Sequence, residues 1–239
     1  MQKNINIYEP EFVKNLFNQM SSSYDRMNFI TSFGFSILWR KQFINKIDHS
    51  NNEIKVLDLL SGLGENWNIL IKKYPNAEFI GLDFSDEMVT KSREKSLKKF
   101  GNSFKVLQQD ILKNKLRSNE FDRIYSAFGL KTFNEEQLNI LAENLNRILK
   151  KDGQFSFIEI SKPKNPILLF LYSFYLGKMI PILGKLFLGN PDDYKMLWTY
   201  TKNFKDCTVT KNIFEKHNLD IEYHEYFWGC ATGITGRKK

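Results

Sequence analysis

Residues 54–65 read IKVLDLLSGLGE, and residues 77–83 read AEFIGLD. The first stretch begins with an apolar run that predicts a buried parallel strand, which ends in a carboxylate and a turn with two glycines. A helical pattern follows over about 66–73, and the second apolar run then ends at Asp83. This order of strand, glycine turn, helix, strand and acid predicts the first half of a dinucleotide-type α/β fold. The plainer interpretation is a βαβ unit with a tight turn and no ligand.

The glycine turn carries the wrong charge for a nicotinamide cofactor. No third glycine follows Gly62 and Gly64, and Glu65 adds negative charge where a pyrophosphate would lie on the helix N-terminus. An acidic first loop suits a cationic ligand, and S-adenosylmethionine carries a sulfonium and an ammonium group. Asp83 suits a ribose, because a carboxylate accepts hydrogen bonds from both hydroxyls. We therefore expect S-adenosyl-L-methionine as the cofactor.

The rest of the chain continues the alternation of strands and helices, which predicts a doubly wound, Rossmann-like sheet. Strands are expected at about 54–59, 78–83, 104–107, 121–126, 154–160, 219–227 and 230–237, with helices at 66–73, 86–99, 135–150 and 206–217. The seventh and last strand is expected to be antiparallel, as a hairpin partner would be. We expect one domain of 1–239, made of a helical N-terminal cap (1–50), a cofactor-binding core (53–160), an apolar substrate lid (161–205) and a C-terminal helix with a strand pair (206–239).

Composition narrows the functional classes. The chain has 239 residues, 42% of them hydrophobic, and a net charge of +8. Its basic residues are scattered and lack an aromatic-interleaved face, so we expect no nucleic-acid partner. Cys207 and Cys230 lack metal-type spacing and suit a reducing cytoplasm. With a polar N-terminus that does not resemble a signal peptide, these features predict a cytoplasmic protein without a metal site.

One apolar segment raises the question of contact with a membrane. Pro166 to Gly189 has the length of a membrane span, but Lys178, Pro181 and Lys185 interrupt it. We interpret the segment as an apolar helical cap that covers a hydrophobic ligand, or as an interfacial helix that makes peripheral membrane contact.

Four predicted strands are followed by, or end in, polar residues that suit a ligand site: Asp58, Asp83, Asp110 and Ser126. Ligands of open α/β sheets bind outside the carboxyl ends of the strands. The Asp110 carboxylate could accept a hydrogen bond from an adenine amino group. The small residues after the fourth strand would let a ligand lie against the backbone. The expected cofactor site also includes the neighbouring residues Ser61, Gly62, Gly64, Phe84, Ile111 and Ala127.

Taken together, these residues resemble the ubiquinone/menaquinone C-methyltransferase family, which has a class I S-adenosylmethionine-dependent fold. The resemblance extends over nearly the whole chain, through FNQMSSSYDRMNFITSFGFSILWR (17–40), FDRIYSAFGLKTF (121–133) and GQFSFIEISKP (153–163). It implies methyl transfer to a ring carbon of a prenylated quinol precursor. It also implies that Tyr24 and Asp25 line the cofactor site, where they could orient groups near the methyl.

The chain departs from the family in its substrate region. Lys131-Thr132 stands where the family has Arg-Asn near the substrate ring, and Ser61 replaces a usual glycine. A cationic Lys131 could stabilise a phenolate and so raise the nucleophilicity of the ring carbon; the bland alternative is a solvated lysine in a loop. Lysine does not reproduce the planar, bidentate geometry of arginine.

Two other functions remain open. The chain could methylate another apolar small molecule, on oxygen, nitrogen or carbon, or it could be a non-catalytic cofactor-binding subunit of a biosynthetic complex. A homo-oligomer is also compatible with the sequence.

Overall fold

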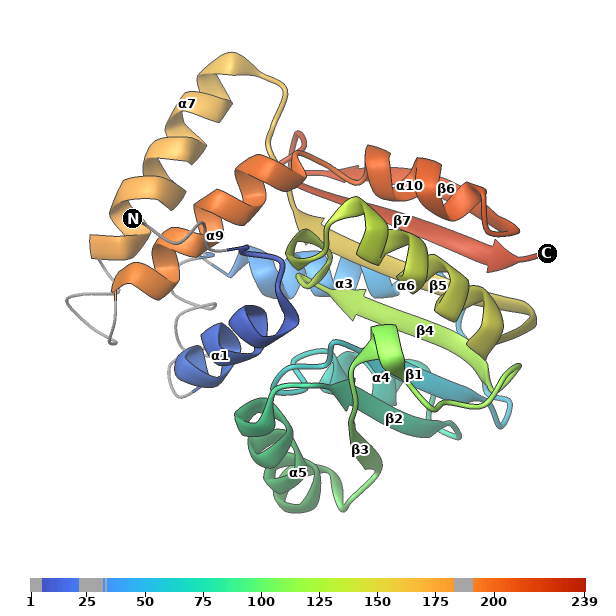
Figure 1. Ribbon diagram of the computed structural model, residues 1–239. Helices are drawn as coiled ribbons and strands as arrows, with labels where there is room; N and C mark the ends of the chain where they lie inside the picture. Colours follow the sequence, from blue (N-terminus) through green and yellow to red (C-terminus); the bar gives the residue numbers. More distant parts are fainter. Residues whose placement is uncertain (1–5, 22–31, 33, 183–190) are drawn as a thin grey trace.

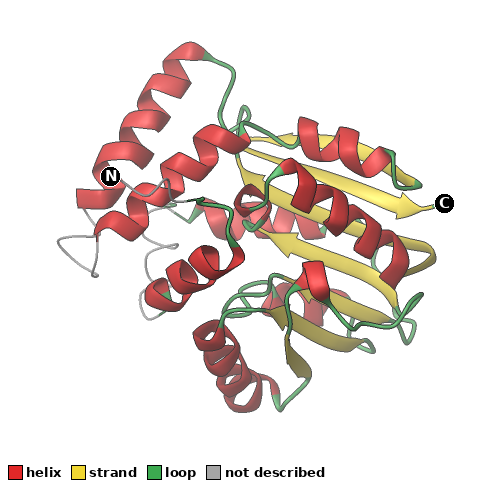
Figure 2. Cartoon of the chain, in the orientation of Figure 1, coloured by secondary structure: helices red, strands yellow, loops and turns green. Residues whose placement is uncertain are grey.

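A computed structural model describes residues 6–21, 32, 34–182 and 191–239 (Figure 1). In this part of the chain, helices cover both faces of a seven-stranded sheet with the order β3-β2-β1-β4-β5-β7-β6 (Figure 2). The strands are β1 (Lys55–Leu59), β2 (Glu78–Asp83), β3 (Phe104–Gln108), β4 (Phe121–Ala127), β5 (Leu149–Ile160), β6 (Leu219–Tyr226) and β7 (Ala231–Lys238). The main helices are α1 (Pro10–Met20), α3 (Phe35–Ile44), α4 (Trp67–Lys73), α5 (Asp86–Phe100), α6 (Glu135–Ile148), α7 (Pro166–Phe174), α9 (Pro191–Phe204) and α10 (Thr208–Glu215).

The predicted Rossmann-like fold is confirmed. Strands β1 to β5 pair in parallel, and β7 lies between β5 and β6 and is antiparallel to both. Because β1, β2, β3 and β4 run in the same direction, the loops that leave them emerge at one edge of the sheet. That edge is where the candidate site forms.

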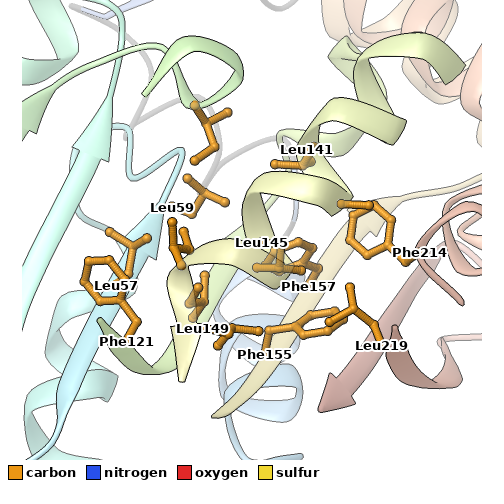
Figure 3. Close-up of a cluster of buried hydrophobic side chains, with 14 of the residues drawn as sticks. Leu57, Leu59, Phe121, Leu141, Leu145, Leu149, Phe155, Phe157, Phe214 and Leu219 are labelled. Carbon is orange, nitrogen blue, oxygen red and sulfur yellow. The ribbon is translucent and has the colours of Figure 1, made fainter. Parts of the chain in front are cut away.

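Each face of the sheet has its own apolar core. Leu57 and Leu59 of β1 pack with side chains of α6 and α10, such as Leu145 and Phe214, on one face (Figure 3). On the other face, Trp67 of α4 stacks on Phe104 of β3 with ring centroids 4.3 Å apart. Burial on both faces explains why the central strands are nearly continuous apolar runs.

Strand β5 starts earlier than predicted. It begins at Leu149 rather than near residue 154, and its register against β4 shifts between Phe121 and Arg123. Asp152 has a φ of 61° at this irregularity. Residues 151–153, which fall between the predicted helix and the predicted strand, therefore form an irregularity within β5, because extra residues on one strand can be absorbed without ending the ladder.

The segment after β5 leaves the sheet. Asn165 caps α7 by accepting from the backbone N–H groups of Ile167 and Leu168, and Pro166 occupies the first helical turn. A π-helical turn, η3 (Tyr175–Met179), follows α7 and packs against α9. Together α7 and α9 project from the sheet beside α1 (Figure 1). Among the described residues, no helix has the length and apolar character that crossing a membrane requires.

Candidate active site

A first cavity, which we call the strand-end cavity, lies at the carboxyl ends of the parallel strands. Its volume is about 60 Å³. Six of the predicted cofactor residues line it: Gly62, Asp83, Phe84, Asp110, Ile111 and Ala127. These six come from the ends of β1, β2, β3 and β4, as parallel strand direction requires.

Asp83 is the principal acid of this cavity. It is 7% exposed, and its Oδ2 accepts the Gly62 backbone N–H at 2.8 Å while Oδ1 accepts the Ser85 N–H at 3.0 Å. Burial raises the pKa of Asp83, and the backbone donors oppose that shift. The Phe84 backbone N–H also contributes, and a carboxylate offers about four acceptor positions, so capacity for a ligand remains.

The two turn glycines have different surroundings. Gly62 has a φ of 52°, and a Cβ there would meet only Glu65 Oε2, at 3.4 Å. Gly64 has a φ of 71°, and a Cβ there would lie 2.4 Å from the Trp67 ring. Both positions favour glycine because of the positive φ, but Gly64 also makes room for the indole. Gly64 therefore acts on the cavity through the shape of the turn.

Asp58 lies beneath the turn rather than in the cavity wall. It is 1% exposed and accepts from Asn66 Nδ2 at 2.7 Å and from Trp67 Nε1 at 3.0 Å. Asn66 in turn accepts from Arg40 Nη1 at 2.8 Å. Burial raises the pKa of Asp58 to about 7, although Asn66 and Arg40 oppose the shift. This buried network ties the glycine turn to α4 and α3.

The two serines predicted for the site also lie outside the cavity lining. The hydroxyl of Ser61 points toward β2, since a Cβ on Gly81 would meet it at 3.2 Å. The Oγ atoms of Ser61 and Ser126 are buried and have no hydrogen-bond partner in the described part of the chain. Tyr24 and Asp25 lie outside the described residues, so their placement in the site stays a prediction.

Helix α1 covers the strand-end cavity, which sequence reasoning missed. Val13 and Phe17 line the cavity, and Asn18 Oδ1 accepts the Ser85 hydroxyl at 2.7 Å and the Glu87 N–H at 3.2 Å. Lys14 pairs with Asp86 at 2.8 Å. The apolar spacing of this helix was visible in the sequence, but nothing there indicated which surface it would cover.

A second, larger cavity, which we call the apolar cavity, adjoins the first. Its volume is about 300 Å³, and its walls come mainly from α1, α3, α7, η3 and α9. The predicted lid thus contributes Leu168, Tyr172 and Leu176, which face inward from one side of the α7–η3 segment. Phe17, Phe128 and Thr132 line both cavities, so these side chains lie between them.

Lys131 lines the apolar cavity and is buried, with 6% exposure. Its Nζ lies 2.8 Å from Glu159 Oε1 and 2.7 Å from the Phe128 carbonyl oxygen. It is therefore not the solvated loop lysine that the sequence left open. Glu159 stands in a strand-five motif that was noted from the sequence, but its pairing with Lys131 across 28 residues was not predicted.

This fold, with a cavity at the strand ends that Asp83 and Asp110 line and an apolar cavity beside it, is that of a methyltransferase. Solved structures of that class share the fold. A SAM-dependent methyltransferase from Thermotoga maritima, described as a possible histamine N-methyltransferase, superimposes with a TM-score of 0.64 at 16% identity, covering 94% of this chain and 99% of that one. A SAM dependent methyltransferase from Aquifex aeolicus superimposes with a TM-score of 0.59 at 19% identity, covering 84% and 89%.

The chain belongs to the ubiE/COQ5 methyltransferase family, whose sequence profile matches residues 4–238. It is similar to the demethylmenaquinone methyltransferase of Staphylococcus haemolyticus, at 31% identity over 96% of this chain and 95% of the relative. The Staphylococcus carnosus protein of the same name is 31% identical over 97% of this chain and 95% of its own length. The resemblance inferred from the sequence motifs is thus confirmed at the level of the family.

Proposed function

We propose that this enzyme transfers the methyl group of S-adenosylmethionine to a ring carbon of a prenylated quinol in menaquinone or ubiquinone biosynthesis. The strand-end cavity would receive the cofactor, and the apolar cavity would receive the quinol ring. The names of the two staphylococcal relatives support this class of acceptor.

The residues of the strand-end cavity fit the cofactor. Asp83 keeps acceptor capacity for a ribose diol, and Asp110 uses Oδ1 to accept the Leu112 N–H, which leaves Oδ2 for an amino donor. Phe84 and Ile111 supply apolar walls for an adenine, and the open side of Gly62 permits close approach of a ligand to backbone. Because Val13 and Phe17 of α1 line a cavity of about 60 Å³, which is smaller than the cofactor, we expect α1 to shift outward when the cofactor enters.

One observation carries the proposal: the two cavities share Phe17, Phe128 and Thr132 as their dividing wall. A direct displacement requires donor and acceptor to be held in line and in contact. A cavity whose two acids and apolar walls suit a nucleoside, next to a mainly apolar cavity that suits an isoprenoid ring compound, meets that requirement.

Bound S-adenosylmethionine supplies an electrophilic methyl group on a sulfonium sulfur. The apolar walls keep water away from that centre and hold the acceptor ring against the shared wall. The ammonium of Lys131 has three donors, of which two are directed at Glu159 and the Phe128 carbonyl. The third can stabilise a phenolate oxygen of the acceptor, which raises the electron density at the neighbouring ring carbon. As that carbon bonds to the methyl group the methyl–sulfur bond breaks, and the ring carbon then releases its proton, ultimately to solvent, which restores the aromatic ring.

Tyr24 and Asp25 complete the proposal. Their positions in the family motif support a role as orienting groups near the transferred methyl. Asp58, Ser61, Gly64 and Ser126 remain proposed contributors that act by shaping the turn and the strand ends rather than by lining the cavity.

The test combines cofactor affinity with turnover. Asp83→Asn keeps the size of the side chain but leaves one acceptor oxygen, so it should weaken S-adenosylmethionine binding by about 2 kcal/mol, or roughly 30-fold. Calorimetry measures the affinity, and methylation of reduced, short-tailed demethylmenaquinol and of a methoxybenzoquinol analogue that lacks the ring methyl is followed by mass spectrometry. Asp220→Asn, on the exposed edge strand β6, is the matched control and should bind normally.

Equal affinity in Asp83→Asn and the control would remove Asp83 from the cofactor site. A second candidate function, methylation of another apolar acceptor, is motivated by Lys131-Thr132 in place of the family's Arg-Asn. A panel of apolar phenols and amines tests this second function. A methylated product from a panel member, together with no product from either quinol, would favour it over the proposed function.

A further inference from the structure

The outer face of α7 is apolar and exposed. Ile167, Phe170 and Phe174 are 73%, 70% and 54% exposed, at helical spacings that place them on one side. The inner side of the same helix lines the apolar cavity through Leu168 and Tyr172. A helix that only capped a cavity would need one apolar face, so the second face requires its own explanation.

The turn between β6 and β7 carries two more exposed apolar side chains. Trp228 is 74% exposed, and its ring lies 4.8 Å from that of Phe227, which is 43% exposed. The turn is next to α7, because Tyr172 donates its hydroxyl hydrogen bond to the Cys230 carbonyl at 3.1 Å. We call Ile167, Phe170, Leu171, Phe174, Phe227 and Trp228 the apolar face.

The apolar face reaches the mouth of the apolar cavity. Leu171, which is 58% exposed, and Phe227 belong both to the face and to the cavity lining. At about 300 Å³, the cavity is at the low end of the roughly 300–1,000 Å³ typical of ligand pockets. A long isoprenoid tail attached to a ring in the cavity would therefore extend out across this face.

The charge around the face is positive. Residues 161–182 contain three lysines and no aspartate or glutamate; Lys164 pairs with Glu225 at 3.0 Å, and Lys178 is exposed to solvent. Ser36 lines both the apolar cavity and a neighbouring open groove of about 700 Å³. That groove is lined by basic residues (Arg40, Lys41, His49, Lys72, Lys73 and Lys95), with Glu65 as its acid. Lys41 and Lys72 are exposed to solvent there.

We propose that the apolar face docks on an anionic lipid bilayer, with the basic groove beside it facing the headgroups, so that a lipid-soluble acceptor passes from the bilayer directly into the apolar cavity. Aromatic side chains such as Trp228 favour the membrane interface, and basic residues near an anionic surface add about fivefold each to binding. A second copy of the chain is the poorer occupant, because each copy carries a net charge of +8 and would bring like charges together. The inference deepens the proposed function and rests on it for the identity of the acceptor, but the docking itself does not depend on turnover.

Vesicle co-sedimentation tests the docking. The intact protein should bind vesicles of phosphatidylcholine with phosphatidylglycerol more tightly than vesicles of phosphatidylcholine alone, and less tightly as salt is raised. Phe170→Asp/Phe174→Asp, outside the cavity lining, should lower binding at least about tenfold, because two large apolar groups no longer enter the interface. Leu97→Asp, at a 66% exposed position on α5 away from the face, is the matched control and should bind like the unchanged protein. Lys41→Glu/Lys72→Glu should reduce the preference for anionic vesicles.

Two further measurements separate the inferences. Turnover of a short-tailed, water-soluble acceptor should be unchanged in Phe170→Asp/Phe174→Asp, while turnover of the acceptor embedded in vesicles should fall. Absence of vesicle binding, or equal binding by the double variant and the Leu97→Asp control, would overturn the docking surface. A dimer in sedimentation equilibrium that the double variant abolishes, without vesicle binding, would instead make the face a contact between copies. Normal vesicle binding without methylation of any quinol would refute the proposed acceptor and leave the docking surface standing.

Discussion

Lys131 and Glu159 form a buried ion pair whose removal has a calculable cost. Their side chains are 7% and 0% exposed, and Nζ lies 2.8 Å from Oε1. The Glu159 carboxylate also accepts the backbone N–H groups of Lys131 at 3.1 Å and of Ile160 at 2.7 Å. Lys131→Met removes the counter-charge but leaves both backbone donors in place.

Breaking a buried pair by removing one partner costs about 3–5 kcal/mol, because the other charge stays buried without compensation. The two backbone donors that remain on Glu159 favour the lower end, so we expect Lys131→Met to lose about 3 kcal/mol of unfolding free energy. Turnover should fall about 10²-fold, the scale of losing one donor to a developing oxyanion. Lys131→Arg keeps the cation and restores the family residue, so this variant should retain most of the unfolding free energy and most of the turnover.

Urea denaturation followed by tryptophan fluorescence measures the unfolding free energy, and turnover is measured at saturating cofactor where every variant is folded. Lys150→Met is the matched control, because Lys150 forms a 2.7 Å ion pair with Asp122 but its side chain is 43% exposed. That surface pair should contribute no more than about 1 kcal/mol. Equal stability losses in Lys131→Met and the control would refute the reasoning about the buried pair, and full turnover in Lys131→Met would refute the catalytic role.

Two further substitutions test the glycine turn. Gly64→Ala should lower the unfolding free energy in urea by about 2–3 kcal/mol, because its Cβ would lie 2.4 Å from the Trp67 ring at a φ of 71°. The control Gly101→Ala, also at positive φ but with no atom within 4 Å, should lower it by about 1 kcal/mol. A smaller loss for Gly64→Ala than for Gly101→Ala would contradict the packing argument. Burial raises the pKa of Asp58 from 3.8 to about 7, so the native state binds the proton more tightly than the unfolded chain. The unfolding free energy contributed by this group should therefore fall by about 4 kcal/mol as pH rises from about 4 to about 7. Asp58→Asn should lack that dependence, and parallel profiles of Tm against pH for the two proteins would show that Asp58 does not titrate in this range.

The sequence by itself predicted the sheet, its seven strands and the set of strand ends that meet around the strand-end cavity. Apolar runs of strand length, two turn glycines and the acids after them were sufficient, because parallel strands bring their carboxyl ends to one edge whatever the details of packing. For that reason Gly62, Asp83, Asp110 and Ala127 could be expected to meet around one cavity, and they do.

Side-chain direction was decided only by the tertiary structure. Asp58 and Ser61 stand at the same edge as Asp83, but one bonds to Asn66 and Trp67 below the turn and the other points at Gly81. A position at a strand end fixes where the backbone lies, whereas the direction of a side chain there depends on which neighbours offer donors and space. Sequence position does not contain that information.

Contacts between distant segments were likewise beyond the sequence. The pairing of Lys131 with Glu159, the cover that α1 forms over the strand-end cavity, and the exposed outer face of α7 each depend on how separate elements pack. An apolar helix pattern states that a surface must be buried, but only the folded chain shows what buries it. In α7 the folded chain covers one side and leaves the other exposed. This division of one apolar helix into two surfaces arises because Leu168 and Tyr172 pack against the core cluster that holds Trp39 and Cys230, and not from the composition of the helix.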